Sequence, residues 1–222
     1  MKYLKPLAGS AVLIGLMLAA SAWAWPRLGD QLVAIHFGID GRPDGFAPKT
    51  VALLAMPGVA VMLSLLLGAL PAAMPATARL ERSWGPYVVV WTGATGMLLA
   101  IHLALIAFAL GMPVSIPRVT TLGVGLLLAV MGNLLGKVRY NYVFGVRTPW
   151  TLANERVWDR THRFAGWMTL LGGLAAVAAA LVTPAGAETL LLPALMVCGI
   201  TPGLAAAIYS FFDSRRGGRE AA

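Results

Sequence analysis

The sequence predicts an all-α, polytopic integral membrane bundle of six transmembrane helices with both termini in the cytoplasm. Of the 222 residues, 59% are hydrophobic and only 12% are charged, whereas a soluble protein carries about 25% charged residues. Six apolar stretches are long enough to cross a bilayer, and Lys and Arg are concentrated in alternate loops. This composition excludes an intrinsically disordered chain, a disulfide scaffold and an ordinary cytosolic enzyme.

The six apolar stretches are predicted to be helices because of their length and environment. A helix rises about 1.5 Å per residue, so about 20 residues cross a hydrocarbon core of about 30 Å. No Asp, Glu, Lys or Arg lies inside any stretch, and backbone groups in lipid must be hydrogen-bonded within the segment. The stretches are Leu7–Trp25, Val51–Leu70, Tyr87–Leu110, Val119–Gly136, Phe164–Thr183 and Leu190–Phe212.

The first stretch has two interpretations. Lys2 and Lys5, followed by an apolar run and Ala22-Trp23-Ala24, also resemble a secretory signal peptide with its cleavage site. The run is near full spanning length, however, and Trp23 and Trp25 are typical of a membrane interface. These two features favour a first helix that is retained.

The distribution of basic residues predicts the orientation. Of the 17 Lys and Arg residues, 13 lie on the side that holds both termini and four on the other. The positive-inside rule then places the termini and the loop 137–163 in the cytoplasm and the loop 26–50 outside, within a single membrane domain of residues 1–222. The net charge of +8 is explained by basic loops beside anionic lipid, so no direct contact with nucleic acid is expected.

Small residues and one histidine stand out within the predicted spans. Gly125, Gly132 and Gly136 in the fourth span, and Ser64 and Gly68 in the second, favour close packing of helices. No predicted span contains an acidic residue with which His102 could exchange a proton. We therefore expect it to form a hydrogen bond to a neighbouring helix.

The outer loop contains consecutive turn signals between residues 35 and 49. Glycines, prolines and Asp44-Gly45 predict a turn-rich cap tied by its own Asp side chains, with His36 hydrogen-bonded inside it. A metal site of His36, Asp40 and Asp44 is a weaker alternative, because one histidine and two carboxylates are a poor metal signature. No metal and no cofactor is predicted, and the single Cys198 cannot form an internal disulfide.

The cytoplasmic loop is predicted to contain a short helix that leads into the fifth span. Pro149 suits the first turn of such a helix, with Thr148 or Thr151 as its cap. On that helix Asn154, Trp158 and His162 follow at intervals of four residues, so they share one face. A polar stripe of this kind indicates a hydrogen-bonded seam or a binding surface, and the seam is favoured because buried polar groups are usually satisfied.

Arg147 is the residue of this loop with the clearest binding chemistry. It lies in the run Gly-Val-Arg-Thr-Pro-Trp, residues 145–150. Its guanidinium can bind a phosphate or carboxylate through two hydrogen bonds, or stack on Trp150. No phosphate loop, zinc-binding histidine pair or nucleophile elbow accompanies it, so the sequence does not indicate an enzyme.

The run from Gly132 to His162 closely resembles the signature of the SdpI family of bacterial membrane immunity proteins, and residues 35–49 resemble the short domain of unknown function that accompanies it. The matching positions inside are Asn141, Gly145, Arg147, Thr148, Pro149, Trp150, Thr151, Asn154, Trp158, Thr161 and His162. Those outside are His36, Gly41, Asp44, Gly45 and Lys49.

The resemblance implies a non-enzymatic, multi-pass protein of the bacterial inner membrane that protects its producer from a secreted, membrane-acting peptide toxin. The implied partners are membrane lipid, the toxin and a cytoplasmic transcriptional repressor that such a protein holds at the membrane. A small transporter or lipid-handling protein, in which Arg147 meets anionic headgroups, remains the alternative. A membrane enzyme that uses His36 or His162 is the least supported hypothesis.

Overall fold

The computed structural model describes residues 4–73 and 80–219, so Lys2 and Arg79, two of the basic residues counted above, lie outside the described residues. Six helices are long and apolar enough to cross a membrane, which confirms the six predicted spans. They are α1 (Leu4–Ala24), α2 (Lys49–Ala73), α3 (Trp84–Ala109), α4 (Ile116–Leu135), α6 (Glu155–Val182) and α7 (Leu191–Arg219). Shorter elements are α5 (Pro149–Ala153) and the 3₁₀ turns η1 (Trp25–Arg27), η3 (Leu80–Ser83) and η4 (Glu188–Leu190).

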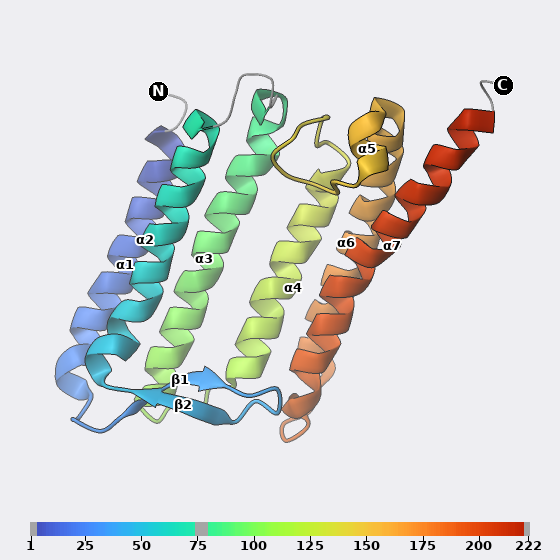
Figure 1. The fold of residues 1–222 in the computed structure, drawn as a ribbon. Coiled ribbons are helices and arrows are strands. Elements are labelled where there is room, and N and C mark those ends of the chain that lie inside the picture. Colours follow the sequence, from blue (N-terminus) through green and yellow to red (C-terminus); the bar gives the residue numbers. More distant parts are fainter. Residues whose placement is uncertain (1–3, 74–79, 220–222) are drawn as a thin grey trace.

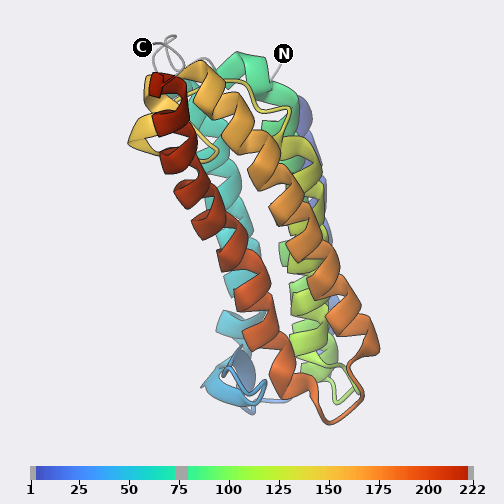
Figure 2. The same ribbon diagram turned by 90° about the vertical axis from the view of Figure 1, so that its right-hand side faces the viewer.

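The long helices lie side by side, and successive helices run in opposite directions (Figure 1). Both ends of the chain and α5 lie at one end of the bundle, which we call the terminal end. The strands β1 (Val33–Phe37) and β2 (Pro43–Ala47) lie at the opposite, hairpin end (Figures 1 and 2). The loops predicted on opposite sides of a membrane are therefore at opposite ends of the molecule.

The bundle consists of two three-helix groups. Helices α1, α2 and α3 pack on one another, and α4 packs on α6 and α7. The contact between α3 and α4 joins the groups, and the α4–α6 pair is the most extensively packed of all. Large apolar side chains such as Val182, 78% exposed, point outward, whereas His102 and Thr121 are fully buried. This arrangement suits a lipid environment, in which exposed apolar side chains contact lipid and need not be buried by protein.

Glycines bring the backbones of α4 and α6 into direct contact. A Cβ at Gly132 would overlap the backbone of Leu170, and a Cβ at Gly166 would lie 2.8 Å from the carbonyl oxygen of Gly132. Further along, a Cβ at Gly173 would lie 2.6 Å from the carbonyl oxygen of Gly125. The prediction of close packing is confirmed for Gly125 and Gly132. Only glycine lets the backbones approach this closely.

The other predicted small-residue positions have more space. A Cβ at Gly136 would lie 3.7 Å from the Arg163 side chain, and Gly68 faces the side chains of Leu7 and Trp91 rather than a backbone. Ser64 is buried within α2. Of the small residues singled out in the sequence, only Gly125 and Gly132 therefore lie in tight backbone contact, and both belong to the α4–α6 pair.

His102 connects the three N-terminal helices through hydrogen bonds. Its Nε2 lies 2.9 Å from the Ser21 hydroxyl of α1, and that hydroxyl donates to the carbonyl oxygen of Leu53 in α2 at 2.7 Å. Because the Ser21 proton is used on Leu53, the hydroxyl accepts from His102. The expected hydrogen bond from His102 to a neighbouring helix is confirmed.

The outer loop forms an antiparallel hairpin, which the all-α prediction did not include. β1 pairs with β2 in a register that runs from Val33 opposite Ala47 to Phe37 opposite Pro43, with two irregularities. Gly41 turns the chain at φ 75°. The run Val33–Phe37 is rich in β-branched and aromatic residues, which favour strands, but β2 contains Pro43 and Gly45, which conceal the strand in the sequence.

We predict that Gly132→Ala lowers the free energy of unfolding of the bundle by ~1–3 kcal/mol, the usual cost of overpacking a core. The added methyl group would overlap the backbone of α6, which cannot move aside as a side chain can. Unfolding of the purified protein in detergent, followed by circular dichroism, measures the loss. Gly58→Ala in α2, where a Cβ meets nothing within 4 Å, is the matched control. Equal stability of the two variants would contradict the close contact.

Candidate functional site

The site at the terminal end is a loop, residues 136–154, held over the ends of α4 and α6. Asn141, which is fully buried, shapes its first half. The Asn141 amide nitrogen donates to the Arg139 carbonyl oxygen at 2.9 Å. Its Oδ1 accepts from the backbone N–H groups of Val143 and Phe144, at 2.8 and 2.9 Å. One side chain thus satisfies three backbone groups in a part of the loop that contains no helix or strand.

His162 holds the second half of the loop from below. Its Nδ1 donates to the carbonyl oxygen of Trp158 at 2.9 Å, so its Nε2 is the acceptor for the Val146 N–H at 3.0 Å. Gly145 passes directly over the ring at φ 115°, and a Cβ there would overlap His162 Nε2. Glycine is therefore required at position 145 for both its backbone conformation and its size.

Trp158 connects the start of the loop to His162. The fully buried indole donates from Nε1 to the Val138 carbonyl oxygen at 2.9 Å. Its ring stacks on the His162 imidazole, with centroids 4.0 Å apart, and meets Tyr140 edge-on at 5.4 Å. The predicted hydrogen-bonded seam is confirmed for Trp158 and His162, which lie on one face of α6.

The short helix α5 is fixed by a reciprocal cap and by contacts with α7. The Thr148 hydroxyl accepts from the Thr151 N–H, and the Thr151 hydroxyl accepts from the Thr148 N–H. Thr148 Oγ1 lies 3.0 Å from the Ser210 hydroxyl, and the Trp150 ring meets Phe211 at 5.1 Å. Pro149 is the first residue of α5, and Thr148 is its cap, as predicted.

The predicted single helix from Pro149 onward is interrupted at Asn154. This residue is extended, at φ −149° and ψ 119°, and separates α5 from α6. Its side chain accepts from the N–H groups of Arg156 and Val157, which makes it the N-cap of α6. Asn154 is exposed, so it does not share the buried face of Trp158 and His162. The fifth span accordingly begins at Glu155, nine residues before the predicted start at Phe164.

Arg147 lies on the surface of the loop. Its guanidinium donates to the Tyr142 carbonyl oxygen at 3.1 Å, and Trp150 packs against Phe211 instead of against Arg147. Since a guanidinium has five N–H donors, this bond leaves others directed outward. Arg147 is therefore held in place and able to accept an anion from the terminal end.

Two serines complete the site, and sequence reasoning missed both. Ser83, fully buried beside α3, accepts from the Arg139 N–H at 2.9 Å. Ser210 of α7 bonds to Thr148 as described. Ser83 is 56 residues from Arg139 in the chain, and Ser210 is 62 residues from Thr148. A lone serine in an apolar segment gives no local signal of such a distant partner.

The hairpin end carries a second cluster of polar residues. His36 Nδ1 and Asp44 Oδ1 are 2.5 Å apart on the exposed surface of the hairpin, and Asp40 accepts from the Arg42 N–H at 3.1 Å. The prediction of a cap tied by its own Asp side chains, with His36 hydrogen-bonded within it, is confirmed. In the described part of the chain, no group of three or more His, Cys, Asp or Glu side chains could hold a metal ion.

Lys49 anchors the hairpin to the start of α2. Its ammonium forms an ion pair with Asp30 at 2.8 Å and lies over the Trp25 ring, 5.5 Å from the centroid. The hydrogen bond and charge of Lys49 hold the pKa of the Asp30 carboxyl below its usual value. The Lys49 side chain thus stabilises this end of the fold through both contacts.

The candidate site residues predicted from the sequence therefore fall into two separate sites at opposite ends of the bundle (Figure 1). The loop, α5 and the first turns of α6 form one continuous hydrogen-bonded unit. A sequence model of the SdpI/YfhL protein family matches residues 137–209, a range that covers the loop from Lys137, α5, α6 and the first part of α7. It ends just before Ser210 and Phe211, which contact the loop. The C-terminal part of the chain is thus similar to the SdpI family. A domain of unknown function, DUF1648, matches residues 12–61, which include the hairpin.

The chain is similar to "Immunity protein SdpI" of Bacillus subtilis (strain 168), with 36% identity over 77 residues. The alignment covers 35% of this chain and only 37% of that relative. No solved structure matches. With six helices long and apolar enough to cross a membrane, and with its match to the SdpI/YfhL model, this is a multi-pass bacterial membrane protein.

We predict that Asn141→Ala loosens the loop, because two backbone N–H groups lose their acceptor at a cost of ~1–3 kcal/mol for each buried group. Trypsin cleavage after Arg139 and Arg147 should accelerate in the folded, purified protein. Arg156→Ala, an exposed change on α6, should leave that rate unchanged. Asn141→Asp keeps the acceptor oxygen, so its cleavage rate should lie between those of Asn141→Ala and the wild type. A wild-type cleavage rate in Asn141→Ala would show that the Asn141 side chain does not hold the loop.

Proposed function

We propose that this protein is a non-enzymatic immunity protein that protects the cell that makes it against a secreted, membrane-acting peptide toxin. The observation that carries the proposal is the family match over the loop, α5, α6 and α7, together with the relative named as an immunity protein. The polar atoms of His162 and Thr151 are engaged in hydrogen bonds to the backbone, which suits a structural role better than a catalytic one.

The proposed orientation has the terminal end in the cytoplasm and the hairpin end outside. It is supported by the excess of Lys and Arg in the terminal-end loops. A toxin that arrives from outside would then meet the hairpin first, and the Arg147 loop would face cytoplasmic partners.

The hairpin has the mixed surface that an amphipathic peptide requires. Leu32, Ile39 and Phe46 are 61%, 62% and 55% exposed. The His36–Asp44 pair lies on the same hairpin, also exposed to solvent. Apolar anchors beside charged groups are typical of binding surfaces. We therefore propose the hairpin as the first contact for the toxin.

The terminal-end loop is the proposed contact for a cytoplasmic repressor. Arg147 presents its outward donors there, and the contacts of Thr148 and Trp150 with α7 connect the loop to a helix that reaches the hairpin end. Signalling requires that toxin binding changes the position of α7 or α6, since a ligand shifts an equilibrium only through differential binding.

Orientation is testable with single cysteines in a Cys198→Ala background. We expect a membrane-impermeant maleimide to label Ile39→Cys in intact cells and to label Arg156→Cys only after the membrane is permeabilised. Both residues are exposed, so accessibility reports the side of the membrane. The reverse labelling pattern would invert the proposed orientation.

Immunity is testable by membrane depolarisation and survival of sensitive cells exposed to the peptide toxins of the producing organism. We expect wild type to protect and Asp44→Ala to lose about tenfold or more of that protection, because the His36–Asp44 bond is removed from the contact surface. Gln31→Ala, an exposed change beside the hairpin, is the matched control. Arg147→Ala should retain protection but lose repressor recruitment.

Expression levels must match between variants, as measured by immunoblot of the membrane fraction. If the wild type protects against none of these peptides, the immunity proposal is rejected. A growth or lipid-composition phenotype in the absence of toxin would instead support a transporter or lipid-handling role.

A further inference from the structure

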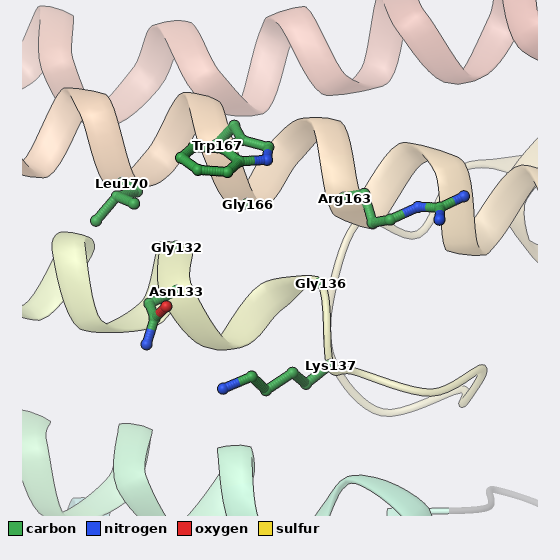
Figure 3. Close-up of a pocket in the computed structure, with 8 residues that line it drawn as sticks. All are labelled: Gly132, Asn133, Gly136, Lys137, Arg163, Gly166, Trp167 and Leu170. Atoms are coloured by element: carbon green, nitrogen blue, oxygen red, sulfur yellow. The ribbon is translucent and has the colours of Figure 1, made fainter.

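A recess lies beside the point where α4 and α6 touch, at the terminal end. Because Gly132 and Gly166 pack backbone to backbone, neither helix has a side chain there to fill the adjoining space. The recess has a volume of about 210 Å³. Its lining, shown in Figure 3, consists of Gly132, Asn133, Gly136, Lys137, Arg163, Gly166, Trp167 and Leu170.

The recess carries two positive charges and no carboxylate in its lining. Lys137, just beyond the end of α4, extends along the recess toward Asn133, while the Arg163 side chain lies along α6 at the other end of the recess and points away from Asn133 (Figure 3). In residues 4–73 and 80–219 neither side chain forms an ion pair or hydrogen bond, whereas Arg160 pairs with Asp213 and Arg118 with Glu188. The two cations of the recess are therefore available to an anion.

The helix faces that continue from the recess toward the hairpin end are apolar. Two stripes with the same 4-3-4 spacing run along the antiparallel helices. One consists of Leu126, Val130 and Asn133 on α4 and Lys137 just beyond its end, and the other of Arg163, Trp167, Leu170 and Leu174 on α6. Leu126, Val130, Trp167 and Leu174 are among the exposed side chains. Residues at this spacing share one face of a helix. The surface is thus charged at the terminal end and apolar below it, which is the polarity of a lipid molecule.

We propose that this recess binds the headgroup phosphate of an anionic phospholipid, with an acyl chain along the apolar α4–α6 face. The Arg163 guanidinium can donate two parallel hydrogen bonds to phosphate oxygens, and Lys137 adds a second positive charge. The Asn133 amide supplies a further donor, and Trp167, 67% exposed, lies where indoles favour the headgroup region. A soluble phosphate would use only the two cations, so the apolar stripes favour the lipid. The site does not depend on the proposed toxin.

The experiment measures lipid binding to the purified full chain in detergent by native mass spectrometry. Phosphatidylglycerol and phosphatidylcholine with identical acyl chains are titrated separately, and inorganic phosphate is added as a competitor. We expect phosphatidylglycerol to bind to the wild type at least about tenfold more tightly than to Lys137→Ala/Arg163→Ala, as the loss of two charge-assisted contacts predicts. Arg156→Ala/Arg216→Ala removes the same charge from exposed positions and should bind like the wild type.

Three outcomes would overturn the proposal. Equal loss in both double variants would show attraction to net charge alone, and equal retention of phosphatidylcholine would show that no headgroup is recognised. Displacement of the lipid by millimolar phosphate would show a site for free phosphate. Thermal unfolding in detergent without anionic lipid confirms that the variants are folded. If the double variant does not fold, Lys137→Gln and Arg163→Gln separately replace it, and an unchanged affinity in both would reject the site.

Discussion

The direct backbone contact between α4 and α6 is the constraint on which the terminal half of the molecule depends. Glycines at positions 125, 132, 166 and 173 allow it, and association of helices in lipid relies on such packing because apolar side chains gain little by leaving the lipid. The contact fixes the start of α6 beside the end of α4, so Trp158 reaches the Val138 carbonyl oxygen just beyond α4. The same lack of side chains that permits the contact leaves the recess beside Lys137.

The residues that mark the family in the loop have a shared physical purpose, which is to satisfy backbone groups at the edge of a hydrophobic region. Asn141, Thr151 and His162 each bond to the backbone of the loop, and unpaired backbone groups are costly where water is scarce. Gly145 is required by its conformation and by the ring below it. These bonds fix the path of the loop although it has almost no regular structure, and they leave Arg147 on its exposed surface.

Much of this could be predicted from the sequence because the signals are local. Apolar length predicted the six spans, small residues predicted the contact of Gly125 and Gly132, and four-residue spacing placed Trp158 and His162 on one face. The break at Asn154 was missed because an Asn within a helical pattern is compatible with both a cap and a helix interior until its backbone conformation is known. The contributions of Ser83 and Ser210 depend on which helices become neighbours, which periodicity does not specify. The short β2 strand was concealed by its proline and glycine.

The hydrogen bonds of His102 have a consequence for the order in which the protein assembles. Ser21 leaves the ribosome 81 residues before the histidine with which it pairs, so α1 and α2 enter the membrane while an essential partner is still unmade. The Ser21 hydroxyl can bond to Leu53 at that stage, but the histidine can find its acceptors only when α3 has been inserted and has come to lie against α1. The N-terminal half therefore reaches its final packing as a unit of three helices, after synthesis of the third, rather than one helix at a time.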